Sequence, residues 1–95
     1  MLKGYVYIFT NFNKTTHYIG VTNNLARRVN EHYGEEGSKF TKKYKCKYLV
    51  YYEEFERIDD AIKREKQLKN WHREWKLSLI KSVNPEMLDL SGELF

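Results

Sequence analysis

The segment "THYIGVTNNLARRVNEHY" (residues 16–33) predicts a short strand, a tight connection and a helix. The strand ends at Gly20, and either asparagine of the following pair can cap the helix by accepting a hydrogen bond from its first turn. The helix has apolar residues at helical spacing, namely Leu25, Val29 and Tyr33. Arg28 and His32 border that apolar stripe, whereas a surface helix normally keeps its charges on the opposite side. The segment therefore predicts a helix that holds two polar side chains near the protein interior.

The rest of the chain supplies two more strands and two more helices. Residues 5–10 and 47–53 are rich in β-branched and aromatic residues, which favours strands, and 5–10 can form a hairpin with residues 18–21. Within 5–10, alternation predicts that Tyr5, Tyr7 and Phe9 face one way and that Val6 and Ile8 face the other. Helices are predicted from Asp59 to Asn70 and from Trp71 to Val83, with Asn70 as the cap of the latter. The order ββαβαα predicts an α+β domain with a small three-stranded antiparallel sheet flanked by helices.

Composition limits the class of protein. A chain of 95 residues, with 41% hydrophobic and 32% charged residues, is one small globular domain. No apolar run approaches the roughly 20 residues of a membrane span, and the first residues lack the pattern of a signal peptide. The single cysteine, Cys46, excludes an internal disulfide and suits a reducing compartment, so we expect a cytoplasmic protein.

Charge divides the chain unevenly. Residues 84–95 hold three acidic residues and no basic ones, which leaves 17 basic against 10 acidic residues, a net charge of +7, in residues 1–83. Five lysines lie between Lys39 and Lys47, and such a field indicates either a polyanionic partner, nucleic acid before membrane, or a solvated basic face. We therefore separate a domain, 1–83, from an acidic and apolar tail, 84–95. The tail could fold back onto the body, mediate an oligomer or a larger complex, or be frayed.

Glu65 falls in the middle of the apolar stripe of the helix predicted from Asp59 to Asn70. A carboxylate on an inward stripe is costly unless it is paired or binds a metal. A structural ion pair with a nearby base, or a rotated helix that leaves Glu65 at the rim, would also explain its position.

The other residues that could take part in a reaction also have purely structural explanations. Arg28 can grip a phosphate and His32 can act as an acid or base, but a border histidine is often only hydrogen-bonded, and the tyrosines could simply cover a sheet face.

Several common sites are excluded by the motifs. One cysteine and three histidines do not give zinc-ligand spacing, and the chain has no glycine-rich phosphate loop. No Ser-His-Asp triad can be placed.

Three motifs in order carry a family resemblance. "YVYIFTN", then "HYIGVTNNLARRVNEH", then a carboxylate in "AIKREKQLK" resemble the GIY-YIG nuclease superfamily over roughly residues 4–81. The likeness is strongest to small stand-alone members, which resemble the N-terminal endonuclease domain of the repair excinuclease and the catalytic domain of GIY-YIG homing endonucleases.

The resemblance assigns roles by position. Tyr7 matches the first motif tyrosine, and Tyr18 opens the second motif. The family's arginine, ten residues later, matches Arg28 rather than Arg27, and the histidine of homing-enzyme relatives matches His32. The family's single metal ligand matches Glu65. Periodicity independently marks Arg28, His32 and Glu65 as unusually placed.

The resemblance implies a DNA endonuclease that uses one divalent metal, Mg²⁺ or Mn²⁺, held by Glu65. Arg28 would bind the scissile phosphate, Tyr7 or Tyr18 would position or deprotonate water, and His32 would support that tyrosine or the phosphate. Four basic residues would contact the DNA backbone away from the cut: Lys42, Lys43, Lys45 and Lys47. The substrate could be branched, single-stranded or damaged DNA, as in repair or recombination. The alternatives are a non-catalytic nucleic-acid-binding module on the same fold and a nuclease that works only inside a larger complex.

The chain departs from the family pattern at two places. Tyr5 stands where the first motif usually has glycine, and Val21 follows the second motif where the excinuclease type has lysine. No counterpart is assigned to the late asparagine of some relatives, since the predicted last helix offers only Ser78 in that stretch.

Overall fold

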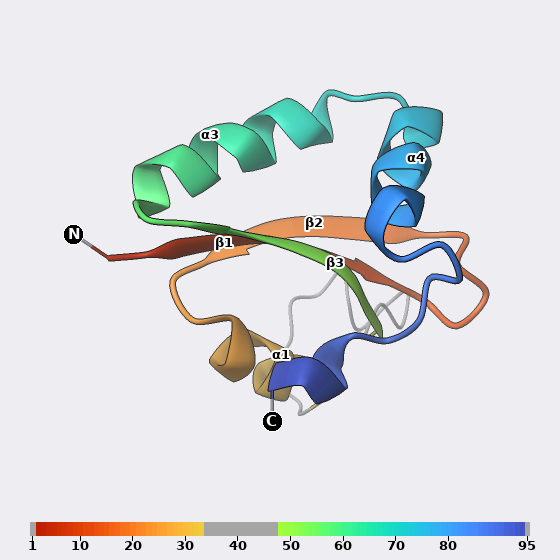
Figure 1. The fold of residues 1–95 in the computed structure, drawn as a ribbon, viewed down its shortest axis with the longest axis horizontal. Coiled ribbons are helices and arrows are strands. Elements are labelled where there is room, and N and C mark those ends of the chain that lie inside the picture. Colours follow the sequence, from red (N-terminus) through yellow and green to blue (C-terminus); the bar gives the residue numbers. More distant parts are fainter. Residues whose placement is uncertain (1, 34–47, 95) are drawn as a thin grey trace.

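Alternating side chains of the first strand divide the protein into two layers. In the computed structural model, which describes residues 2–33 and 48–94, strand β1 runs from Gly4 to Thr10. Tyr7 and Phe9 enter one buried cluster, while Val6 and Ile8 enter a second on the other face of the sheet. The predicted alternation is confirmed, and both faces of the sheet are buried because each is covered by a helical layer (Figure 1).

The described strands form one antiparallel sheet in the order β2-β1-β3. Strand β2 (His17–Thr22) pairs with β1 as a hairpin, and β3 (Tyr48–Phe55) pairs with the other side of β1. The predicted α+β class, with the order ββαβαα, is confirmed. Strands β2 and β3 are the outer strands, so side chains that cross either of them reach an edge of the sheet.

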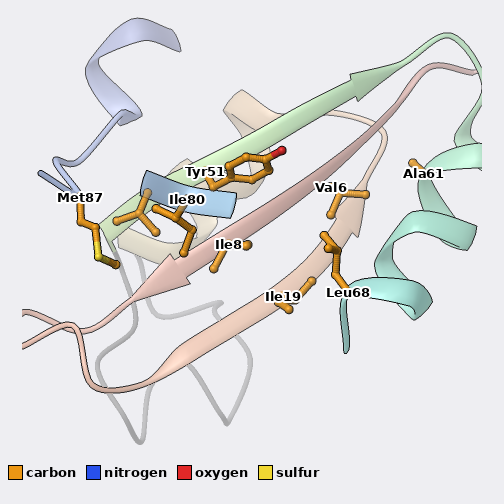
Figure 2. Close-up of a cluster of buried hydrophobic side chains, with 9 residues drawn as sticks. Val6, Ile8, Ile19, Tyr51, Ala61, Leu68, Ile80 and Met87 are labelled. Carbon is orange, nitrogen blue, oxygen red and sulfur yellow. The ribbon is translucent and has the colours of Figure 1, made fainter. Parts of the chain in front are cut away.

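Helices α3 (Ile58–Lys69) and α4 (Arg73–Val83) cover one face of the sheet (Figure 1). Figure 2 shows the buried cluster between them and the strands, to which α3 contributes Ala61 and Leu68 and α4 contributes Ile80. The prediction that Asn70 caps the last helix is wrong. Asn70 instead ends α3, where its backbone N–H donates to carbonyls of the last turn, and the chain needs Trp71 and His72 to turn before α4 begins.

Helix α1 (Leu25–Tyr33) and the short 3₁₀ helix η1 (Ser91–Leu94) cover the opposite face and contact each other. Of the two candidate caps, Asn24 is the one used, because its Oδ1 accepts a hydrogen bond from the Arg27 N–H at 3.0 Å. Leu25 and Val29 are buried in the cluster that contains Tyr7. This layer therefore presents the Arg28 side of α1 to the sheet.

The C-terminal segment folds back onto the body through a bulge in β3. Ile8 pairs with Tyr51 and Phe9 with Leu49, which leaves Val50 as an extra residue in the strand. The buried side chain of Asn84 donates to the Val50 carbonyl at 2.9 Å and to the Leu88 carbonyl at 2.9 Å. The Leu90 N–H in turn donates to the Leu49 carbonyl at 2.7 Å. These bonds attach residues 84–90 to β3, so this part of the tail folds back onto the body, one of the alternatives that the sequence left open.

Candidate functional site

Tyr7 and Gly20 face each other across β1 and β2 and can be understood only together. The Tyr7 ring is buried and passes directly over Gly20. A Cβ atom at position 20 would stand 2.7 Å from Tyr7 Cε2 and closer still to the hydroxyl. Glycine is therefore required here by the close approach of a ring, and it lets the Tyr7 hydroxyl reach toward the β2 edge of the sheet.

The Arg28 side chain joins α1 to this hydroxyl. Arg28 Nε donates to Tyr7 Oη at 2.9 Å, and Arg28 Nη1 lies 3.2 Å from Glu31 Oε2. The neighbouring Arg27 is exposed, donates to Asn23 and lies 3.7 Å from Glu31 Oε1. The two consecutive arginines thus point in different directions from the helix, and Arg28, not Arg27, reaches Tyr7. We call Tyr7, Arg28 and Glu31 the Tyr7 trio.

The electrostatic surroundings of Tyr7 bring two more residues into the site. Burial raises the pKa of the Tyr7 phenol, the hydrogen bond and charge of Arg28 oppose that rise, and Tyr18 and the Glu65 carboxylate add to it. The Tyr18 ring lies 6.4 Å from the Tyr7 ring, centroid to centroid, and is half-buried. Tyr18 and Glu65 are therefore close enough to act on the Tyr7 hydroxyl electrostatically, from β2 and α3 respectively.

Glu65 is partly buried, with 15% of its side chain exposed, and it forms an ion pair with Lys69 at 3.4 Å. The pairing base that the sequence allowed as an alternative is thus present. The Lys69 side chain is 54% exposed, however, and a pair between residues four apart on a helix surface contributes only a few tenths of a kcal/mol. The carboxylate can therefore exchange this partner for a ligand at little cost.

The donor set around Glu65 fits one kind of metal ion. Within residues 2–33 and 48–94, no three His, Cys, Asp or Glu side chains gather closely enough to enclose a metal. Mg²⁺ keeps several waters and is commonly held by one or two carboxylates together with substrate phosphate. A single, partly exposed carboxylate suits such an ion and does not suit zinc, which takes three or four protein ligands.

The structure brings Tyr7, Tyr18 and Arg28 together from β1, β2 and α1, and Glu65 of α3 lies within electrostatic reach of Tyr7. The backbone of His32 lies in α1 four residues after Arg28, and its side chain falls outside the described part. The predicted backbone-binding lysines (Lys42, Lys43, Lys45 and Lys47) and Cys46 also lie outside the described residues. Glu31 was missed from the sequence, although its spacing of three residues from Arg28 was a readable signal of a helical pair.

A second group with the same three residue types lies at β3, and we call it the Tyr51 trio. The Tyr51 hydroxyl donates to the Glu53 carboxylate. Arg64 of α3 binds that carboxylate twice, at 3.0 and 3.1 Å, donates to Gln67 at 2.6 Å and lies over the Trp71 ring. Here the carboxylate stands between the arginine and the tyrosine, so each group already has a strong partner.

Comparison with known proteins identifies the family of this chain. Residues 3–78 match the GIY-YIG catalytic domain, so the chain belongs to the GIY-YIG nuclease family, as the motifs indicated. The match includes the Tyr7 trio, Tyr18 and Glu65.

Two sequence relatives and one solved structure are small proteins of similar length. A UPF0213 protein of Syntrophus aciditrophicus is 42% identical over 89 residues, covering 93% of this chain and 100% of the relative. A UPF0213 protein of Staphylococcus haemolyticus is 36% identical, covering 84% and 96%. The solution NMR structure of a UPF0213 protein from Bacillus halodurans superposes with a TM-score of 0.59 at 26% identity, covering 90% of this chain and 89% of that one. No helix of the described ranges is long and apolar enough to cross a membrane.

Proposed function

We propose that this protein is a metal-dependent endonuclease that hydrolyses DNA phosphodiester bonds, with structured or damaged DNA in repair or recombination as its substrate. The single cysteine suits a reducing compartment such as the cytoplasm. The observation that carries the proposal is the Arg28 guanidinium against the Tyr7 hydroxyl, with the Glu65 carboxylate within electrostatic reach of the same oxygen.

Arg28 binds the scissile phosphate in this proposal. A guanidinium has five N–H donors, and the contacts to Tyr7 and Glu31 engage Nε and Nη1. The remaining donors are available to a phosphate oxygen and would stabilise the charge that develops there in the transition state. About a third of the Arg28 side chain is exposed, 29%, which leaves room for this approach.

Tyr7 is the stronger candidate for the residue that takes a proton from the attacking water. Its oxygen accepts a hydrogen bond from Arg28, and although burial raises the pKa of the phenol, the charge of Arg28 opposes that rise and favours the phenolate. Tyr18 is more exposed and remains the alternative. His32, on the same helix as Arg28, would support the tyrosine or the phosphate.

Glu65 would hold Mg²⁺ or Mn²⁺, with water and phosphate oxygens as the other ligands. When bound, such an ion stabilises the leaving oxygen and the charge on the phosphate. Lys69 would leave the carboxylate as the site fills, because both compete for the same oxygen atoms.

The test is cleavage of plasmid, branched and single-stranded DNA by the purified protein with Mg²⁺ or Mn²⁺. Glu65→Ala and Arg28→Ala should each lower cleavage by about 10²-fold or more. Arg27→Ala and Glu56→Ala serve as matched controls, since both residues are exposed and neither is among the groups that act on the Tyr7 hydroxyl. If the wild type binds DNA but cleaves none of these substrates, the non-catalytic binding module replaces this proposal.

A further inference from the structure

A cavity of about 450 Å³ opens at the end of the sheet, beside the turn that joins β1 to β2. Its walls come from three separate segments: residues 10–14, Tyr48 at the start of β3, and residues 87–89 of the C-terminal tail. The volume falls within the roughly 300 to 1,000 Å³ of small-molecule sites. We call this cavity the Phe12 pocket. It shares no lining residue with the Tyr7 trio, so the candidate cleavage site does not account for it.

Two large apolar side chains at the rim of the Phe12 pocket are exposed to solvent. Phe12 is 77% exposed and Leu88 is 59% exposed. Exposed large hydrophobic side chains are few in residues 2–33 and 48–94, namely Leu2, Phe12, Trp75, Val83 and Leu88. A single exposed apolar side chain needs no explanation, but two at the mouth of one cavity indicate a binding surface.

The aromatic rings of the Phe12 pocket suit a flat ligand. The Phe12 and Tyr48 rings lie 6.2 Å apart, centroid to centroid, and are tilted by 59°. A tilted pair is a favourable arrangement of aromatic rings, and it supports Phe12 without covering it. Thr10 and Met87, which are both buried, line the inner part of the cavity, and Figure 2 shows Met87 in the adjoining apolar cluster. A supported but uncovered ring is the feature on which nucleobases stack.

Two residues with unusual backbone geometry fix the rim of the pocket. Lys14 has a φ of 60° and Met87 a φ of 52°, and within residues 2–33 and 48–94 no other non-glycine residue has a positive φ. Such backbone is unfavourable for these side chains and persists only where the surrounding structure enforces it, as it often does in ligand clamps. Lys14 Nζ donates to the Glu86 carbonyl at 3.2 Å, which joins the β1–β2 turn to the tail. The pocket is therefore preformed.

We propose that the Phe12 pocket binds an unpaired nucleobase of the DNA substrate, with the Phe12 ring as the stacking surface. The inference rests on the proposed function for its ligand, and it deepens that function by favouring DNA with an unpaired strand over an intact duplex. The net charge of +4 attracts a polyanionic strand in preference to an apolar protein segment. Lys14 and Asp89 both line the pocket, so their opposite charges suit a neutral base better than a phosphate.

The test measures DNA binding without cleavage. Fluorescence anisotropy in EDTA compares three labelled probes of equal length: an oligodeoxyadenylate, a fully abasic strand with the same phosphates, and a duplex. The wild type should bind the oligodeoxyadenylate at least about fivefold more tightly than the abasic strand, since one stacked base is worth about 5- to 150-fold in affinity. Phe12→Ala should lose about fivefold or more for the oligodeoxyadenylate and less than about twofold for the other two probes. Its slope of log K against log salt should not change, because no phosphate contact is removed.

Trp75→Ala is the matched control, because Trp75 is also an exposed aromatic residue, at 55%, and does not line the pocket. Phe12→Tyr keeps a ring and should bind within about twofold of the wild type. Equal losses in Phe12→Ala and Trp75→Ala would mean that any exposed ring contributes, and would overturn the proposal. Equal binding of the oligodeoxyadenylate and the abasic strand by the wild type would also overturn it. Unchanged single-strand affinity in Phe12→Ala, together with loss of self-association in sedimentation, would assign the pocket to a second copy of the chain instead.

These outcomes separate this inference from the nuclease proposal. A preference for base-bearing strands that depends on Phe12 supports the pocket even if no DNA is cleaved. Cleavage that depends on Glu65 and Arg28, together with strand binding that does not depend on Phe12, would support the nuclease and overturn the pocket.

Discussion

The two trios contain the same residue types and lie on opposite faces of the sheet, but they differ in which residue stands between the other two. In the Tyr7 trio the arginine is in the middle, so the phenol oxygen meets a cation. In the Tyr51 trio the carboxylate is in the middle, so the phenol donates to an anion and the arginine binds that same anion through two nitrogens.

The order changes what each tyrosine can do. Burial raises the pKa of Tyr51, the hydrogen bond to Glu53 raises it further, and Arg64 opposes these effects more weakly, so this phenol stays protonated and serves as a donor. Burial also raises the pKa of Tyr7, and Arg28 offsets only part of that rise. The Tyr51 trio is thus built to hold β3 and α3 together, whereas Arg28 of the Tyr7 trio keeps N–H donors for a ligand. The predictions below test that contrast.

The largest difference is expected between the two arginines. Arg28→Ala should reduce DNA cleavage by about 10³-fold, since it removes a donor to the developing charge, with little loss of stability. Arg64→Ala should leave the cleavage rate within about twofold and lower the free energy of unfolding by about 1 to 2 kcal/mol, because Glu53 loses a two-point partner and Trp71 a stacked cation. Urea denaturation and single-turnover cleavage measure the two effects. A slow Arg64→Ala enzyme with normal stability would contradict the assignment.

The next largest difference is expected between the effects of replacing Tyr7 and Tyr51. Tyr7→Phe should lower kcat by about 10²-fold if Tyr7 is the general base. Tyr51→Phe should leave kcat unchanged and cost about 1 kcal/mol of stability, the net value of one hydrogen bond. Should Tyr7→Phe retain full activity and Tyr18→Phe lose it, the base is Tyr18, and the Tyr7 trio only positions Arg28.

Acid should destabilise the protein through His17, which belongs to neither trio. The pKa of His17 is lowered to about 4 in the folded state by burial, Arg73 and Lys76, against 6.5. The unfolded chain therefore binds more protons between these values, and stability falls as pH drops from about 6.5 toward 4. After allowance for partial exposure, we expect a loss of about 1 to 2 kcal/mol. His17→Gln should remove that part of the pH dependence in urea titrations, and an unchanged slope would refute the burial of a neutral imidazole.

The smallest effect concerns Glu31, which competes with a DNA phosphate for Arg28. Glu31→Gln should tighten DNA binding in EDTA by about threefold, since a neutral amide is a weaker partner for the guanidinium. Glu56→Gln removes the same charge from an exposed residue outside the trio and should change Kd less. Equal gains in both variants would show that Glu31 has no special relation to Arg28.

Much of the fold could be read from local patterns, but the site could be read only in part. Alternation in residues 5–10 predicted which side chains face each layer, and the spacing around Leu25 and Val29 predicted α1. The extra residue at Val50 was not predictable, because the bulge is fixed by pairing with β1 and by the side chain of Asn84, 34 positions later. The cap at Asn70 was misread because an asparagine between two helices can end one as readily as begin the next.

Periodicity and motif spacing are local properties of the chain, so they were enough to predict the order of elements, the family and the residues that depart from the apolar pattern. The sequence marked Arg28 and Glu65, but it allowed two interpretations of Glu65. Three features required the folded structure: Tyr7 passes over Gly20, Arg28 rather than Arg27 reaches the Tyr7 hydroxyl, and Glu65 both pairs with Lys69 and acts electrostatically on Tyr7. Those contacts depend on how β2, α1 and α3 pack against β1, and packing between distant segments cannot be read from spacing.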